Sequence, residues 1–177
     1  METIICLSHQ VETRISDVFF YLLNISEYSE FSPDIPFKMG FPRHGICNKQ
    51  KILIVGVVPE NVKTNPEFIL TTDNGNEAFH VMVDKKDNVI YRWGLVDGEV
   101  KERQGEQDDG TTIDYSEPFT MTIRCDDDGW MLKVNTELGY PHFFHIFSPG
   151  NVTGFEITGD VMITYVGIGD EGHIKQS

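Results

Sequence analysis

The chain has 177 residues, and its 28 Asp and Glu against 14 Lys and Arg give a formal net charge of -14. A surface this acidic repels phosphate backbones and anionic lipids, so nucleic acid and acidic membranes are excluded as expected partners. The length fits one domain with a substantial core, and 11% aromatic with 24% charged residues exclude a chain that is disordered throughout.

The first 32 residues differ from the rest in the spacing of their apolar residues and are expected to form an N-terminal extension. Thr13 or the pair 16–17 could cap a helix here, and five apolar residues recur at helical spacing: Ile15, Val18, Phe19, Leu22 and Ile25. The spacing predicts a short amphipathic helix, although β-branched and aromatic residues lower its propensity. Its apolar face could pack against its own domain or contact a partner.

The same stretch lacks the marks of a secretory signal. Glu2 interrupts the start, no basic region precedes the apolar run, and residues 3–7 are too few for a signal core. We therefore expect a cytoplasmic protein. No run approaches the roughly 18 to 20 apolar residues needed to cross a bilayer, so no membrane span is expected.

From residue 32 onward, short apolar runs alternate with turn formers. The runs cover 50–58, 67–72, 78–83 and 88–93, and the segments between them are rich in Pro, Asn, Asp and Gly. Many short strands without alternating helices indicate an antiparallel sandwich or barrel. Residues 105–116 are typical of a long polar loop.

The last fifty residues give the clearest strand pattern. Residues 119–135 show two apolar alternations separated by Asp-Asp-Asp-Gly at 126–129, which predicts a β-hairpin. Two further apolar segments follow at 142–147 and 155–166.

In their residues and their order along the chain, these segments resemble a galectin from about residue 33 to 168. Segment 35–40 is similar to the family's opening strand, segments 52–59 and 68–70 to its "G-x-V-P … F-x-I-x-L" pair, and segment 78–80 to its apolar-x-His strand. Val134-Asn135, Phe144-His145 and Ile157 to Val161 match the marks "V-N", "x-H-R" and "I-x-G-D-I". The resemblance implies an all-β, galectin-like jelly-roll β-sandwich of two antiparallel sheets. Residues 1–32 would precede this recognition domain of residues 33–168, and 169–177 would form a C-terminal tail.

The resemblance also implies where a sugar would bind. In galectins a galactoside lies on the concave sheet among His, Asn and Arg of "H-x-N-P-R", a further Asn and the group "W-G-x-E-x-R". Hydrogen bonds fix the hydroxyl groups, and the Trp ring covers the apolar C–H patch of galactose.

This chain departs from that pattern at most positions. His80 stands at the family's His, but the following marks are replaced by Met82, Val83 and Asp84, and the second Asn falls on Trp93. Arg103 can be matched to the last Arg, which puts Gly98 at the Trp and Lys101 at the Glu. A shift by two puts Val100 at the Trp instead, so neither placement restores the stacking indole.

These losses predict weak or absent binding of plain lactose or galactose. Each lost contact costs on the order of 1 to 3 kcal/mol, and millimolar affinity corresponds to only about 4 kcal/mol. Trp93 could instead offer a new stacking face within a different polar set. The candidate glycan groove comprises His80, Met82, Asp84, Arg92, Trp93, Glu102 and Arg103. The alternatives for His80 and Trp93, as ordinary members of a strand surface or as a satisfied core pair, stay open.

Enzymatic and metal chemistry are not expected. His80, His142 and His145 lack H-x-x-x-H spacing, and the acidic run at 126–128 lacks the spaced ligands of a calcium loop. Nothing in the sequence orients Cys125 and His145 as nucleophile and base. No cofactor is expected either. Three cysteines, Cys6, Cys47 and Cys125, are too few and too widely spaced for a disulfide framework, so reduced thiols are expected.

The sequence thus predicts a non-catalytic, galectin-like carbohydrate-binding domain with an altered site that recognises a different glycan or glycoprotein. The alternative is a protein–protein interaction module on the same scaffold, with no sugar binding. A homodimer stays open, as does secretion without a signal, because both occur in galectins.

Overall fold

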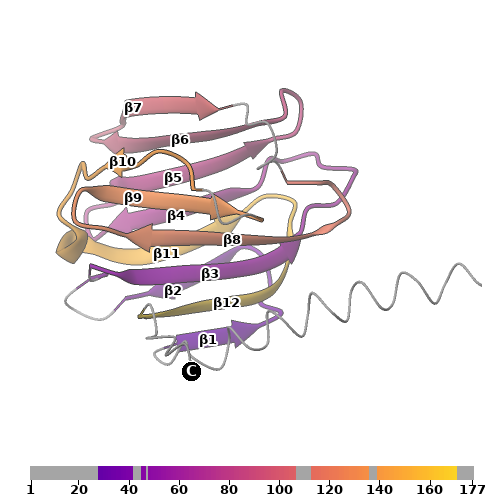
Figure 1. Ribbon diagram of the computed structural model, residues 1–177, viewed down its shortest axis with the longest axis horizontal. Coiled ribbons are helices and arrows are strands. Elements are labelled where there is room, and N and C mark those ends of the chain that lie inside the picture. The colour runs from indigo at the N-terminus through magenta and orange to yellow at the C-terminus, as the bar shows by residue number, and fades with distance from the viewer. Residues whose placement is uncertain (1–27, 42–44, 47, 107–112, 136–138, 171–177) are drawn as a thin grey trace, which may run out of the picture.

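A computed structural model describes residues 28–41, 45–46, 48–106, 113–135 and 139–170 of the chain (Figure 1). The predicted N-terminal helix lies outside these residues, and so does most of the predicted polar loop. In the described part, no helix has the length and apolar character to span a bilayer.

Two six-stranded antiparallel sheets are packed face to face, with sheet A in front in Figure 1. Sheet A has the order β1-β12-β3-β8-β9-β10, with bounds Tyr28–Phe31, Met162–Asp170, Gln50–Val57, Pro118–Cys125, Gly129–Val134 and Phe143–Phe144. Sheet B has the order β2-β11-β4-β5-β6-β7, with bounds Phe37–Gly40, Val152–Thr158, Glu67–Thr72, Glu77–Asp84, Val89–Val96 and Glu99–Glu106. A short 3-10 turn, η1, spans Pro149–Asn151.

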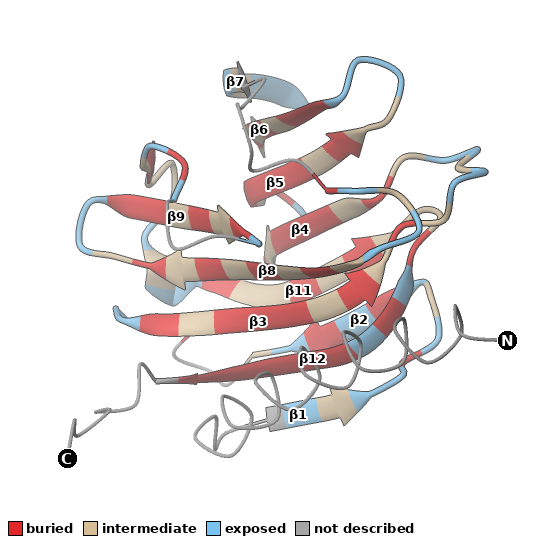
Figure 2. Ribbon diagram, turned by 45° about the vertical axis from the view of Figure 1, so that its right-hand side comes forward, coloured by how far each residue is buried: buried red, intermediate tan, exposed pale blue. Residues whose placement is uncertain are grey.

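The core lies between the sheets because each strand turns alternate apolar side chains inward. In β8 every second residue is buried, and Figure 2 shows the buried positions along both layers. Phe68 of β4 meets Phe119 of β8 edge to face at 6.2 Å between ring centroids, which joins the two sheets. Each fully buried ring contributes about 1.5 to 3 kcal/mol through the area that it removes from water.

The predicted sandwich of antiparallel sheets is confirmed, and the hairpin at 119–135 is formed by β8 and β9. Two of the strands were not among those expected from the sequence. Strand β1 falls within the expected extension and pairs with β12, which itself runs on to Asp170. Strand β7 was not predicted, because its sequence is polar and charged and it lies at an edge of sheet B with exposed residues (Figure 2).

Two residues of the sequence marks bind the backbone of neighbouring segments. Asn135 closes the open end of the β8–β9 hairpin, since its side-chain oxygen accepts the Thr120 N–H at 2.8 Å and its own N–H donates to the Thr120 carbonyl. The Asp160 carboxylate accepts the N–H groups of Lys63 and Thr64 at 2.6 and 2.9 Å. These backbone donors hold the pKa of Asp160 below its ordinary value.

Gly159, just before Asp160, has a φ of +84°, and a Cβ atom there would lie 2.2 Å from the Asn65 carbonyl oxygen. Only glycine fits this turn without displacing the neighbouring backbone. The "I-x-G-D" mark therefore fixes the β11–β12 turn against the loop before β4.

Candidate functional site

The outer face of sheet B, the face turned away from the core, carries most of the predicted groove residues. In β5, Val81 and Val83 point into the core, so His80, Met82 and Asp84 lie on the opposite face. The registers place His80 beside Trp93 of β6 and Ile69 of β4, and Met82 beside Glu67 and Tyr91. We call the set Glu67, Glu77, His80, Met82, Tyr91, Trp93 and Arg103 the sheet B cluster.

A β-bulge in β5 decides which residues join this cluster. Ala78 and Phe79 both point into the core, and the pairing with β4 and β6 shifts between Glu77 and His80. In a regular strand, residues three apart point to opposite faces. The bulge puts Glu77 on the same face as His80.

His80 is enclosed by its neighbours. Its Nδ1 atom lies 2.7 Å from a carboxylate oxygen of Glu77, and its Nε2 atom lies 3.6 Å from a carboxylate oxygen of Glu67. One face of the imidazole stacks on the Trp93 ring with 3.9 Å between centroids. Only 5% of His80 is exposed, so it presents little surface to a ligand.

Aromatic rings and a guanidinium group form the more open part of the cluster. The Arg103 guanidinium lies 4.6 Å from the centroid of the Tyr91 ring and 5.8 Å from that of Trp93. These cation–π contacts orient the Arg103 side chain along the two rings, and Arg103 remains exposed to solvent. The neighbouring Glu102 is exposed, with a φ of +51° where the β6–β7 register shifts.

Arg92 does not lie on this face. Its side chain is fully buried, donates from Nη1 to the Pro141 carbonyl at 2.6 Å and lies 5.1 Å from the centroid of the Tyr140 ring. It therefore anchors the segment before β10 to the interior of the sandwich. Strict alternation along β6 would have assigned Arg92 and Trp93 to opposite faces.

Met82 and Asp84 lie farther along β5. The Met82 sulfur accepts a contact from the Asn65 amide nitrogen at 3.8 Å. The Asp84 carboxylate accepts the N–H groups of Lys86 and Asp87 at 2.9 and 3.3 Å, which caps the β5–β6 turn. Asp84 thus has a structural role in this turn, at the position that the sequence resemblance matches to an Arg.

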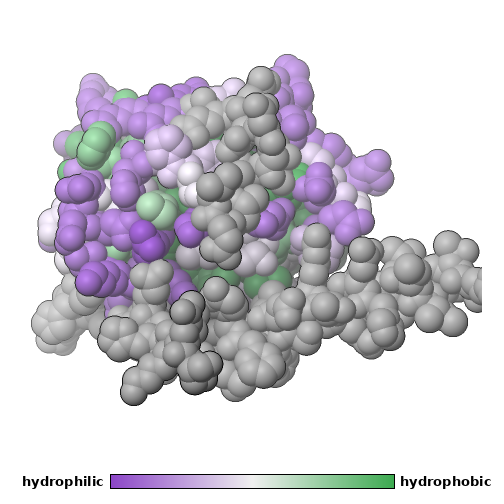
Figure 3. Space-filling model, viewed as in Figure 1, coloured by the Kyte–Doolittle hydropathy of each residue, from purple (hydrophilic) through white to green (hydrophobic). Residues whose placement is uncertain are grey.

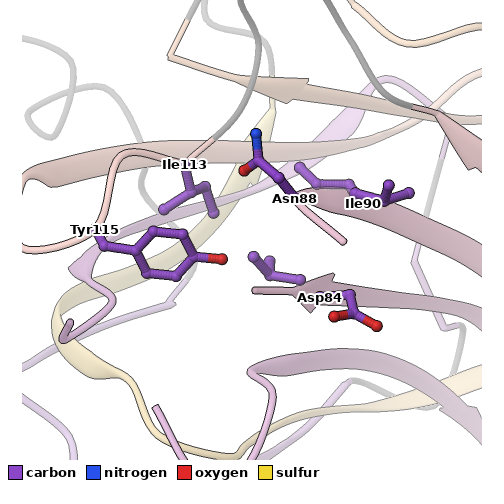
Figure 4. A pocket seen from close by; sticks show the side chains of 7 residues that line it. Asp84, Asn88, Ile90, Ile113 and Tyr115 are labelled. Atoms are coloured by element: carbon purple, nitrogen blue, oxygen red, sulfur yellow. The ribbon is translucent and has the colours of Figure 1, made fainter. Parts of the chain in front are cut away.

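Near this turn, Figure 4 shows a depression between Asp84, Asn88, Ile90, Ile113 and Tyr115. It has no internal space for a water molecule. Burial raises the pKa of the Tyr115 hydroxyl, and the negative charge of Asp84 adds to this effect. A ligand of the sheet B cluster would lie on an open surface rather than in this depression.

The remaining polar groups singled out in the sequence serve the scaffold. Asp126 accepts hydrogen bonds from Arg124 and is 2.9 Å from His142 Nε2, and its backbone N–H closes the hairpin turn onto Gly129. His145 Nε2 lies 2.8 Å from the Asp126 carbonyl, and the Cys125 side chain is buried in the core. Within the described ranges no three His, Cys, Asp or Glu residues gather in a way that could hold a metal ion.

Three members of the cluster were not predicted from the sequence: Glu67, Glu77 and Tyr91. Period-two alternation from Met82 and Trp93 could have placed Glu67 and Tyr91 on their face once the strand pairing was known. Glu77 gives no such signal, because its orientation depends on the bulge.

The comparisons with known proteins agree with this architecture. A family model described as galactoside-binding lectin matches residues 36–168. Galectin-4 from Sus scrofa is 24% identical over 140 residues, which are 78% of this chain and 42% of that protein. The chain thus spans less than half the length of this curated relative.

Solved galectin structures share the fold at low sequence identity. Caenorhabditis elegans galectin LEC-6 has a TM-score of 0.69 and 13% identity, covering 79% of this chain and 94% of that one. A double variant of human galectin-16 has a TM-score of 0.71 and 16% identity, covering 80% of this chain and 99% of that one.

Proposed function

We propose a glycan-binding function for this chain, which belongs to the galactoside-binding lectin family, the galectins. In this proposal the domain is non-catalytic and binds a neutral glycan on the outer face of sheet B. Tyr91, Trp93 and Arg103 provide most of the contact. Plain lactose and galactose bind weakly or not at all.

The observation that carries the altered site is the enclosure of His80. In the family pattern this histidine contacts the sugar, whereas here it stacks on Trp93 at 3.9 Å and faces two carboxylates. A galactose hydroxyl could reach the imidazole only if this packing opened. Met82 and Asp84 replace an amide and a guanidinium, so they leave the hydroxyl groups of galactose without the usual donors.

The half-buried and exposed side chains of the cluster suit a different sugar geometry. The aromatic rings of Tyr91 and Trp93 can cover apolar C–H groups, and the Arg103 guanidinium can donate to hydroxyl oxygens. The Glu67 carboxylate can accept from hydroxyl groups. Because the set is spread along three strands, it favours an oligosaccharide over a single residue.

A glycan array followed by calorimetry on the leading hit tests the proposal. Trp93→Ala and Arg103→Ala are expected to weaken binding at least about tenfold each, which corresponds to about 1.4 kcal/mol. Phe144→Ala and Lys133→Ala on sheet A serve as matched controls, since they remove an exposed aromatic ring and a cation away from the cluster. Equal binding by all four variants, or tight lactose binding, would contradict the proposed site.

The second candidate is a protein-interaction module without sugar binding. The stacking of His80 on Trp93 also favours this second function. The two rings pack against each other and leave His80 buried, so no open polar groove lies at this position. Complete absence of array binding by a folded sample, together with a partner whose affinity falls in Trp93→Ala, would favour this function.

A further inference from the structure

A second apolar surface lies on the outer face of sheet A, far from the sheet B cluster. Ile52 and Ile54 of β3 point into the core, so Leu53 and Val55 point outward. Tyr165 of β12 pairs with Val55 on one side and with Phe31 of β1 on the other. We call Phe31, Leu53, Val55 and Tyr165 the sheet A patch.

Two members of this patch are shielded from water although they face away from the core. Leu53 is 5% exposed and Tyr165 is 3% exposed. The cross-strand neighbours of Leu53 are Gly167 and Thr122, which are too small to enclose a leucine. Tyr165 lies flat over Gly167, where an added Cβ would be 2.2 Å from the hydroxyl oxygen.

The Tyr165 hydroxyl gives independent evidence of a cover. It is buried and has no hydrogen-bond partner among the described residues, and burial raises its pKa. An unsatisfied buried hydroxyl is unfavourable, so a polar group of the covering element is expected to bind it. Phe31 at the rim contacts the Tyr165 ring edge to face at 5.3 Å and is 61% exposed.

We propose that residues 1–27 of the same chain cover the sheet A patch, with the predicted apolar stripe of residues 15–25 facing Leu53 and Tyr165. The segment ends at Tyr28, where β1 begins, and β1 pairs directly with β12. Only Ser26 and Glu27 separate Ile25 from β1, so the stripe cannot reach far from this edge.

The dimensions and chemistry of the segment fit the patch. Eleven helical residues span about 16 Å, close to the width of about 14 Å of the three strands that carry the patch. The side chains of the stripe are apolar, like those of the patch. The same segment contains hydroxyl and amide side chains that could bind the Tyr165 hydroxyl. Figure 3 shows that the coloured part of this face is otherwise mostly hydrophilic, which restricts apolar docking to few places.

The occupant is tested by photo-crosslinking in the full chain. Replacing Phe31 with a photoreactive benzophenone amino acid places the probe at the exposed rim of the patch. In a mixture of isotope-labelled and unlabelled chains, products are expected to join position 31 to residues 11–27 of the same chain. Mixed-isotope products would show a second copy in its place. Products confined to other segments, or no product at all, would equally overturn the proposal.

The contact surface is tested by nitration of Tyr165, followed by peptide mapping. Leu22→Asp puts a charge on the predicted apolar stripe and is expected to increase Tyr165 nitration at least about fivefold. Asn24→Asp adds the same charge on the opposite face of the predicted helix and is expected to leave nitration unchanged. Circular dichroism checks that the sandwich of each variant is folded. Equal nitration in both variants and the unmodified chain contradicts the proposal.

Discussion

The imidazole ring of His80 stacks on the indole ring of Trp93, with 3.9 Å between ring centroids and 27° between ring planes. This pair lies across β5 and β6 on the outer face of sheet B, with Glu67 and Glu77 beside the imidazole and Arg103 over the indole. The residue that matches the family's sugar-contacting histidine is therefore part of a packed unit, and the Trp93 ring that covers it is only half-buried.

The charge around this pair predicts a preference for uncharged glycans. Carboxylates of Glu67, Glu77 and Glu156 lie on the same face, and the Glu156 carboxylate is bridged to Lys38 at 2.9 Å. A sialylated or sulfated version of any bound glycan is expected to bind at least about fivefold more weakly, because it brings another negative charge to this surface. Calorimetry of matched neutral and sialylated glycans at low and moderate salt checks this, and tighter binding of the sialylated form would count against it.

Arg92 is expected to affect stability and to leave glycan recognition unchanged. Its buried guanidinium holds the Pro141 carbonyl at 2.6 Å, so Arg92→Met removes a charge-assisted hydrogen bond and leaves the carbonyl unsatisfied. The free energy of unfolding should fall by about 1 to 3 kcal/mol, measured by urea denaturation. Under conditions where the variant is folded, its affinity for a glycan found on the array should match that of the unmodified chain. A selective loss of affinity would return Arg92 to the binding site.

Gly159→Ala is expected to destabilise the protein more than Gly75→Ala. Both glycines have a positive φ, +84° and +79°, so both substitutions carry a similar backbone cost of about 1 kcal/mol. Only at Gly159 would the new Cβ meet backbone atoms, with the Asn65 oxygen at 2.2 Å, whereas nothing lies within 4 Å at Gly75. Thermal unfolding should show a larger decrease in Tm for Gly159→Ala, and equal decreases would show that the turn can move freely.

Asp126 is expected to make the free energy of unfolding depend on pH in the acidic range. Burial raises the pKa of its carboxyl, but hydrogen bonds from Arg124 and His142 outweigh this effect and hold the pKa below the ordinary value. A lowered pKa in the folded state means that the ionised form stabilises the protein above the unfolded-state pKa of about 3.9. This contribution is lost as the pH falls through the folded-state pKa.

Asp126→Asn is therefore expected to lower the free energy of unfolding by about 1 to 2 kcal/mol near neutral pH. The difference from the unmodified chain should shrink at a pH below the folded-state pKa, where both carry an uncharged side chain. Urea denaturation across this range measures the difference. Asp128→Asn, at an exposed position of the same turn, is the matched control. A difference that is independent of pH would exclude the ionised carboxylate as its source.

The fold was accessible from sequence because local signals agreed with one another. In β8 and β9 the alternation of Phe119 and Trp130 with polar neighbours matches the burial of their side chains. The sequence marks around Asn135 and Asp160 also proved informative about the scaffold, since Asn135 binds the backbone of β8 and Asp160 binds the backbone of the loop before β4. Strand β7 was not predicted from the sequence, because an exposed edge strand does not need alternating apolar residues.

The candidate site was harder to predict from the sequence, because it depends on the register between strands and on the β-bulge. The sequence indicated His80 and Trp93 as candidates, but their stacking follows from the β5–β6 register, which no local pattern gives. Arg92 was included from its neighbourhood in sequence, whereas the pleat of β6 turns it into the interior. Tertiary packing thus decided which polar residues are available to a ligand.

The extra residue in β5 has a consequence for how the family can change. Deleting Ala78 would restore a regular strand in which Glu77 lies two positions before His80, so Glu77 would stay on the same face as His80. An acidic neighbour of the imidazole can therefore stand three residues before it in a bulged strand or two residues before it in a regular one, and a comparison at fixed sequence spacing would overlook that equivalence.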